Sequence, residues 1–375
     1  MRIEFGDLKL GEDAKRHLLD VWKRSWISEG EKVKELEKKW GDLFGYKYNV
    51  SMDNGTNADM ACCMTLYDLC NAKRGDEIIT PALAFAAVGN SILAAGFNPV
   101  FVDIKRETLN IDPEKIESKI SPRTKAIMVV HTMGKPCNMD QIINISRKHH
   151  LSVIEDSCEA HGAKYKGKYV GHFGDMASFS FYAAHLICCG EGGMVSTNNP
   201  DVSSLLKSVK SHGRKEDSFY FDHLRFGLNF KMNDLEAAVG IPQVEGFQKT
   251  FDTRKFNLDY LLQKMQDLTE YAFFISESED EVVCPHAFSI TLKNPKFNLP
   301  NLYKFLEDSS IKCKRTFGSM PTQHKAFEHL GYKLGEFPES EYVGDNGLHL
   351  GVHQYLTMQD LDYTSDILHK YFERF

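Results

Sequence analysis

The stretch SFSFYAAHLICCGEGG, residues 178–193, joins a strand-like run of hydroxyl and aromatic side chains to a glycine-rich turn. Short apolar runs of strand length also occur at 77–80, 99–104, 126–131, 152–155 and 194–197. Helix-like segments separate many of these runs, at 58–70, 86–95, 139–149 and 202–212. Largely apolar strands that alternate with helices are typical of a mainly parallel sheet covered by helices on both faces. The sequence therefore predicts an α/β fold.

The regular alternation ends near Val244. Beyond it we expect a long helix over 253–268, a strand at 288–292, a helix near 301–308, a loop rich in glycine and proline, and a last helix that opens at Thr357. A chain of 375 residues is long enough for about two domains. We predict a large α/β domain at 1–244 and a smaller α+β domain at 245–375.

Composition excludes several classes of protein. The 45 Lys and Arg residues against 52 Asp and Glu residues give a net charge of −7, which argues against a nucleic-acid binder. No apolar run reaches the roughly 18 residues that a membrane helix needs, and the first residues lack the apolar core of an export signal. The nine cysteines include no C-x-x-C pair, which favours free thiols in a reducing compartment. We expect a cytoplasmic protein.

Three short motifs carry residues suited to ligand chemistry. The first is Asn54-Gly-Thr-Asn57, before the predicted helix at 58–70, where backbone N–H groups could bind a phosphate or simply be capped. The second is Asp156, which ends an apolar run and could hold a protonated ring nitrogen, a metal or a ribose, or could cap a helix. The third is His185, between the 178–182 run and the glycine-rich turn. A single histidine of this kind is more often structural than catalytic.

Taken in order along the chain, these motifs resemble the sugar aminotransferase superfamily, pyridoxal 5′-phosphate (PLP) enzymes of fold type I that act on nucleotide-linked 4-keto-6-deoxyhexoses. The resemblance covers nearly the whole chain and includes Ser28-Glu-Gly30, Gly75-Asp-Glu-Ile-Ile79, Pro81-Ala-Leu-Ala-Phe85, Gly190-Glu-Gly-Gly193 and Gly227-Leu-Asn229. It implies the PLP-dependent transferase fold of type I, with a mainly parallel central sheet flanked by helices and a smaller α+β C-terminal domain.

The resemblance implies a binding site for the cofactor phosphate. Gly55, Thr56 and Ser180 stand at the family's phosphate-binding positions. Asn229 would reach the phosphate of the neighbouring subunit's cofactor. The resemblance therefore also implies a homodimer whose active sites are shared between subunits.

The resemblance also implies contacts to the cofactor ring. Phe85 would stack on the pyridine ring, where a flat aromatic face gives contact area and orientation. Asp156 would pair with the ring nitrogen and keep it protonated, and Glu159 would lie near the phenolic oxygen. No metal ion is expected.

One position departs from the aminotransferases of this family. They carry a lysine where this chain has His185, five residues after Ser180 and six before Glu191. That lysine binds the cofactor covalently, which an imidazole cannot do because it has no primary amine. The exchange is the mark of the sugar 3-dehydratases of the same superfamily, which hold the cofactor noncovalently and use pyridoxamine 5′-phosphate (PMP). His185 would act there as the catalytic base.

Cysteine positions separate two subtypes of these dehydratases. The iron–sulfur subtype has cysteines in the segment that here reads SHGRKEDSFY, residues 211–220, without a cysteine. The chain therefore resembles the cluster-free subtype, which acts on GDP-4-keto-6-deoxy-D-mannose and recovers the amine form of the cofactor from L-glutamate. Gly351-Val-His-Gln354 is similar to a motif of that subtype, although His353 could instead be a surface or interface histidine.

The expected function is a PLP/PMP-dependent 3-dehydratase of a nucleotide-linked 4-keto-6-deoxy sugar, with L-glutamate as amino donor and a 4-keto-3,6-dideoxy sugar and ammonia as products. One alternative is an aminotransferase that works without the lysine, on a sugar that need not be nucleotide-linked. Another is a noncatalytic protein that binds the cofactor or a sugar as a regulator. Substrate contacts are expected after Arg214 and around Arg315–Gln323. The sequence leaves the nucleotide and the sugar configuration open.

Overall fold

A central sheet organises the first two thirds of the chain. The computed structural model describes residues 2–6, 8–215 and 221–374. Within these ranges the largest sheet has seven strands in the order β1-β9-β8-β5-β4-β2-β3. Their bounds are Tyr48–Met52 (β1), Glu77–Pro81 (β2), Asn98–Val102 (β3), Thr124–Val130 (β4), Ser152–Asp156 (β5), Met176–Ser180 (β8) and Gly193–Thr197 (β9).

Most neighbours in this sheet are parallel, as the sequence predicts. β3, β2, β4, β5 and β8 pair in parallel, whereas β9 runs antiparallel between β8 and β1. β1 was not predicted from the sequence. Its first residue is exposed and it begins with the polar pair Tyr48-Asn49, so it lacks the continuous apolar run of the central strands.

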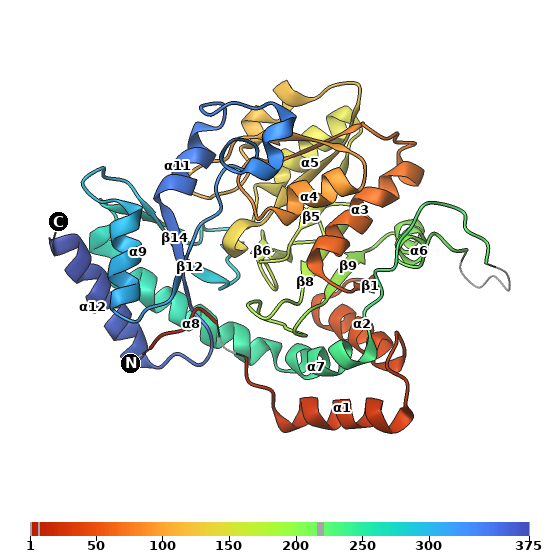
Figure 1. Cartoon of the computed structure of the whole chain (residues 1–375), viewed down its shortest axis with the longest axis horizontal. Coiled ribbons are helices and arrows are strands. Elements are labelled where there is room, and N and C mark those ends of the chain that lie inside the picture. The colour runs from red at the N-terminus through yellow and green to blue at the C-terminus, as the bar shows by residue number, and fades with distance from the viewer. Residues whose placement is uncertain (1, 7, 216–220, 375) are drawn as a thin grey trace.

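Helices cover both faces of this sheet (Figure 1). Successive strand residues point to opposite faces, so Ile78 packs in the core cluster that contains Ala58 of α3, while Ile79 packs in the cluster that contains Ile142 of α5. A third cluster surrounds Trp40 of α2. The helices of this half are Glu12–Arg24 (α1), Glu31–Phe44 (α2), Gly55–Leu69 (α3), Ala87–Ala94 (α4), Met139–His149 (α5), Pro200–Val209 (α6) and Asp234–Glu245 (α7).

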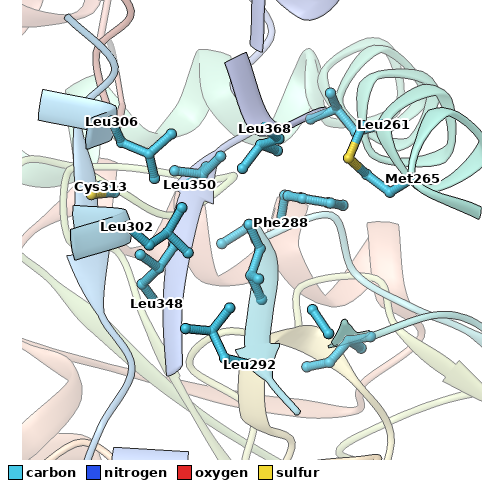
Figure 2. Close-up of a cluster of buried hydrophobic side chains, with 14 of the residues drawn as sticks. Leu261, Met265, Phe288, Leu292, Leu302, Leu306, Cys313, Leu348, Leu350 and Leu368 are labelled. Atoms are coloured by element: carbon cyan, nitrogen blue, oxygen red, sulfur yellow. The ribbon is translucent and has the colours of Figure 1, made fainter. Parts of the chain in front are cut away.

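The last third of the chain builds a second, antiparallel sheet in the order β10-β12-β14-β13. In Figure 2 Phe288 and Leu348 project from adjacent strands of this sheet into a shared core with Leu261 and Leu368 of the flanking helices. The elements are Phe247–Lys264 (α8), Ala272–Phe274 (β10), Ala287–Leu292 (β12), Leu299–Asp308 (α9), Cys313–Arg315 (β13), Met320–Gln323 (α10), Pro338–Asn346 (α11), Gly347–Gly351 (β14) and Met358–Arg374 (α12). A small third sheet joins Glu281–Val282 (β11), Lys164–Tyr165 (β6) and Lys168–Tyr169 (β7).

The prediction of a loop between the helix near 301–308 and the last helix is wrong. That segment contains β13, α10, α11 and β14. β14 is the short sequence Gly-Leu-His-Leu-Gly, and it is a strand because β12 and β13 both pair with it. Such long-range pairing leaves little signal in the local sequence.

The predicted domain boundary at 244/245 falls at the end of α7, just before Gly246 and α8. The division into two domains stays a prediction. In the described ranges, every helix is too short or too polar to cross a membrane.

Candidate active site

A cavity of about 490 Å³ lies at the carboxyl ends of β5 and β8. Open α/β sheets bind ligands at this edge. The cavity lining includes seven of the eight predicted site residues, namely Gly55, Thr56, Phe85, Asp156, Glu159, Ser180 and His185. The eighth, Asn229, is outside this lining and is exposed, next to Ser211. Arg315 also lines the cavity, whereas part of the segment after Arg214 falls in 216–220, outside the described residues.

The start of α3 lines the cavity with Asn54, Gly55 and Thr56. The Asn54 side chain caps the helix by accepting a hydrogen bond from the N–H of Asn57 at 2.8 Å. A Cβ atom on Gly55 would lie 2.6 Å from Cβ of Ser180, so only glycine allows this close approach. The positive end of the helix and the Ser180 hydroxyl therefore point to one place, which suits a phosphate.

Asp156 ends β5 and reaches the cavity from the sheet. Its Oδ1 accepts the backbone N–H of Cys158 at 3.0 Å. A turn and not a helix follows it, so the alternative interpretation of Asp156 as a helix cap is wrong. Asp59 of α3 lies beside it, and ligand atoms of Asp59, Asp156 and Cys158 all lie within 4.8 Å of one another. The prediction of no metal ion stays a prediction.

Three histidines line the same cavity, His185, His286 and His349. In each of them Nδ1 is buried and has no hydrogen-bond partner in the part of the chain that the structure describes. The rings of His185 and His286 lie 5.3 Å apart. Burial lowers the pKa of His185 to about 3, helped by the charges of Arg254 and Lys314. His185 is therefore uncharged at neutral pH.

Glu159 is a second group poised to change charge. Burial raises its pKa to about 7. Its Oε2 accepts the backbone N–H of Met133 at 2.7 Å, and its Oε1 lies 3.6 Å from Nε2 of His286. The carboxyl group therefore gains or loses a proton near neutral pH, at the wall of the cavity.

The cavity residues that were not predicted from the sequence include Asp59, His286, Lys314 and His349. Asp59 did leave a signal, because it is an isolated acidic residue in the apolar first half of the predicted helix 58–70. The other three belong to β13 and β14 or directly precede β12, and only the folded small sheet brings them to the cavity. His353 is buried at 6% exposure, so the interpretation of it as a surface residue of this chain is wrong.

Comparison with known proteins identifies the family. The DegT/DnrJ/EryC1/StrS aminotransferase family model matches residues 9–369. The chain belongs to this family. Its fold is the fold type I of PLP-dependent transferases, as the sequence predicts.

Relatives in this family carry more than one activity in their names. GDP-perosamine synthase of Caulobacter vibrioides is 32% identical, over 96% of each chain. The structure of Escherichia coli GDP-4-keto-6-deoxy-D-mannose-3-dehydratase with bound hydrated PLP matches with a TM-score of 0.88 and 26% identity, over 98% of this chain and 100% of that one. A structure of GDP-4-keto-6-deoxymannose-3-dehydratase with a trapped PLP–glutamate geminal diamine matches with a TM-score of 0.89, at the same identity and coverage.

The cavity fits a PLP-type cofactor in three respects. The close approach of Gly55 to Ser180 forms a cradle for a phosphate. The buried carboxyl of Asp156 forms no ion pair within the described residues, so it is available to a cationic ring nitrogen. The unpartnered Nδ1 of His185 is available to a hydrogen-bond partner. Ser180, Asp156 and His185 therefore each offer the cavity a polar group that a bound cofactor could contact.

Proposed function

We propose that the protein is a PLP/PMP-dependent 3-dehydratase that removes the C3 hydroxyl group of a nucleotide-linked 4-keto-6-deoxyhexose. The observation that carries the proposal is His185, which lines the cavity at the position where aminotransferases of the family carry their lysine. An imidazole cannot bind the cofactor covalently, but it can move a proton. The same position therefore favours a noncovalently held cofactor and a base beside it.

Each cavity residue has a proposed duty. When bound, the cofactor supplies the amino group and an electron sink. Gly55, Thr56 and Ser180 would hold its phosphate, and Asp156 would hold its ring nitrogen. Phe85, 62% exposed, would offer a flat face to the ring. His185 would accept a proton at its unpartnered Nδ1.

Two cations at the edge of the small sheet would bind anionic substrates. Lys314 and Arg315 both line the cavity. Lys314 Nζ lies 4.3 Å from the centre of the Phe5 ring, and Arg315 donates to the carbonyl oxygen of Gly344 at 2.7 Å. The diphosphate of a nucleotide sugar and the carboxylates of L-glutamate suit such cations. The GDP-sugars in the names of the relatives and the glutamate adduct of one relative support these substrate classes.

A second candidate function is an aminotransferase that acts on a related sugar. It is favoured by Lys314, because this primary amine lines the cavity although His185 has replaced the usual lysine. The 32% identity to GDP-perosamine synthase supports it as well. Borohydride reduction of the PLP-loaded protein, followed by peptide mass mapping, separates the candidates. Covalent PLP on Lys314 would favour the aminotransferase, and PLP recovered free from denatured protein favours the dehydratase.

The direct test uses a panel of GDP-, dTDP- and CDP-linked 4-keto-6-deoxy sugars with PLP and L-glutamate. The dehydratase yields a sugar that has lost one oxygen atom, with ammonia and 2-oxoglutarate in equal amounts. An aminotransferase yields an amino sugar and no free ammonia. A noncatalytic protein leaves every sugar unchanged and does not convert PLP to PMP with glutamate. Mass spectrometry of the sugar and an ammonia assay read all three outcomes.

A further inference from the structure

Asp59 and Asp156 place two carboxyl groups close together in the cavity. Asp59, 1% exposed, lies one turn into α3, and Asp156, 6% exposed, ends β5. A carboxylate oxygen atom of Asp59 lies within 4.8 Å of a carboxylate oxygen atom of Asp156. No Lys, Arg or His of the described chain forms an ion pair with either group. The pair therefore has no cation of its own.

Each carboxyl is held by hydrogen bonds from one neighbouring residue, and for Asp156 these come from both the backbone and the thiol of Cys158. The Ser178 hydroxyl donates to Oδ1 of Asp59, and the backbone N–H of Cys158 donates to Oδ1 of Asp156. Burial raises the pKa of both groups, and that of Asp59 more strongly because the charge of Asp156 adds to the effect. Two like charges this close in a buried site cannot both persist without a cation. One group therefore keeps a proton.

The surrounding groups leave that proton with the pair. On α3 and after β5 the neighbouring titratable groups are the thiols of Cys62, Cys63 and Cys158, whose pKa values burial raises well above normal, so they stay neutral. Glu159 also follows β5 and feels the charge of Asp156, and its pKa of about 7 leaves it ionised at alkaline pH. From β8 the neighbour is the Ser178 hydroxyl, which does not titrate in this range. His131 directly follows β4, and it forms a hydrogen bond with Glu155, with Nε2 of the histidine 3.1 Å from Oε2 of the glutamate.

We propose that Asp59 and Asp156 share one proton in the cofactor-free protein and transfer it to the ring nitrogen when the cofactor binds. An O–H bond of the pair breaks as the N–H bond of the ring forms, so the solvent supplies no proton. The total charge of pair and ring is the same before and after. Asp59 is then a positioning residue that keeps this proton beside Asp156. The inference rests on the cofactor of the proposed function and is independent of the dehydration step.

The test counts protons during binding of PMP, which has no aldehyde and so does not react with lysines. Calorimetric titrations are run at an alkaline pH at which the ring nitrogen of free PMP is unprotonated, in two buffers of different ionisation enthalpy. The native protein should take almost no proton from the solvent. Asp59→Asn should take up about one more proton than the native protein, because its single remaining carboxyl is already ionised before binding. Equal proton counts would overturn the proposal.

Asp68→Asn is the matched control. Asp68 lies on the same helix, pairs with Arg225 at 3.1 Å and is outside the cavity lining, so this variant should give the native proton count.

Infrared spectra of the cofactor-free native protein provide a second readout that needs no folded variant. At alkaline pH Glu159 is ionised, so a carboxylic-acid C=O band is expected from the pair, and its absence overturns the proposal. Failure of the sugar assay with PMP binding intact would contradict the proposed dehydratase alone.

Discussion

His185 is the single residue on which the proposed chemistry depends most. His185→Asn keeps a polar side chain in the cavity and removes the proton acceptor. A positioned base contributes roughly 10²- to 10⁴-fold to a rate. We expect sugar deoxygenation to slow by at least about 100-fold, with PMP affinity nearly unchanged because the phosphate cradle and Asp156 remain. Ammonia release and calorimetry measure the two quantities. An unchanged rate would show that His185 is not the base.

Glu159 links the cavity to the pH dependence of stability. Its folded-state pKa of about 7 lies above the ordinary value of 4.5, so between these values the folded carboxyl holds a proton that the unfolded one has lost. The free energy of unfolding should therefore fall as pH rises from 4.5 to 7, relative to Glu159→Gln, which does not titrate. The fall should be at most about 3 kcal/mol. Urea unfolding of both cofactor-free proteins at several pH values measures it, and parallel curves would contradict it.

Residues at the ends of strands and helices could be predicted because their motifs are local. Gly55 begins a helix that follows a polar turn, and Asp156 and Ser180 end apolar strands, so one edge of the sheet collects all three. His286 and His349 could not be predicted in this way. Each depends on the antiparallel pairing of β12 with β14, which joins segments 60 or so residues apart and is set by tertiary packing.

At the scale of elements, we expect the N-terminus of α3 to affect both stability and cofactor binding. Asn54→Ala removes the cap of the helix that presents Gly55 and Thr56 to the cavity, and the loss of a cap costs about 1 kcal/mol. We expect a comparable loss of stability and a weaker affinity for PMP. Asn298→Ala is the control, because Asn298 caps α9 beside the small sheet with a similar bond to the N–H of Asn301 at 2.9 Å. Equal affinity in the two variants would contradict a phosphate role for this helix end.

The accuracy of the predicted elements follows from how local their signals are. The helix predicted at 139–149 coincides with α5, whose Asn138 cap directly precedes it and whose last turn is basic, so both end signals are local in the sequence. α1, Glu12–Arg24, was not predicted, although acidic residues open it and basic residues close it. It buries only Ala14 and Val21 and leaves Leu19 and Trp22 exposed, so its apolar residues do not all lie on the face that packs against the chain.

At the scale of the whole molecule, both the large and the small sheet contribute residues to the cavity lining. Asp156 and Ser180 come from the large sheet, and Lys314 and His349 come from the small one. The proposed cofactor site therefore belongs to the large sheet, whereas the proposed substrate cations belong to the small sheet.

The proposed role of Asn229 extends the site beyond one chain. It is exposed and outside the lining of its own cavity, so a phosphate contact requires a second subunit. In a homodimer with shared sites, a mixed dimer of His185→Asn and Asn229→Ala gathers both defects in one site and leaves the other intact. We expect each variant alone to be impaired and the co-expressed, doubly tagged mixed dimer to regain activity. The control pairs His185→Asn with Ser180→Ala, two residues of the same cavity, which leaves a defect in both sites and should regain nothing. Activity of the first mixed dimer no higher than that of the control would show that Asn229 does not act in the partner's site.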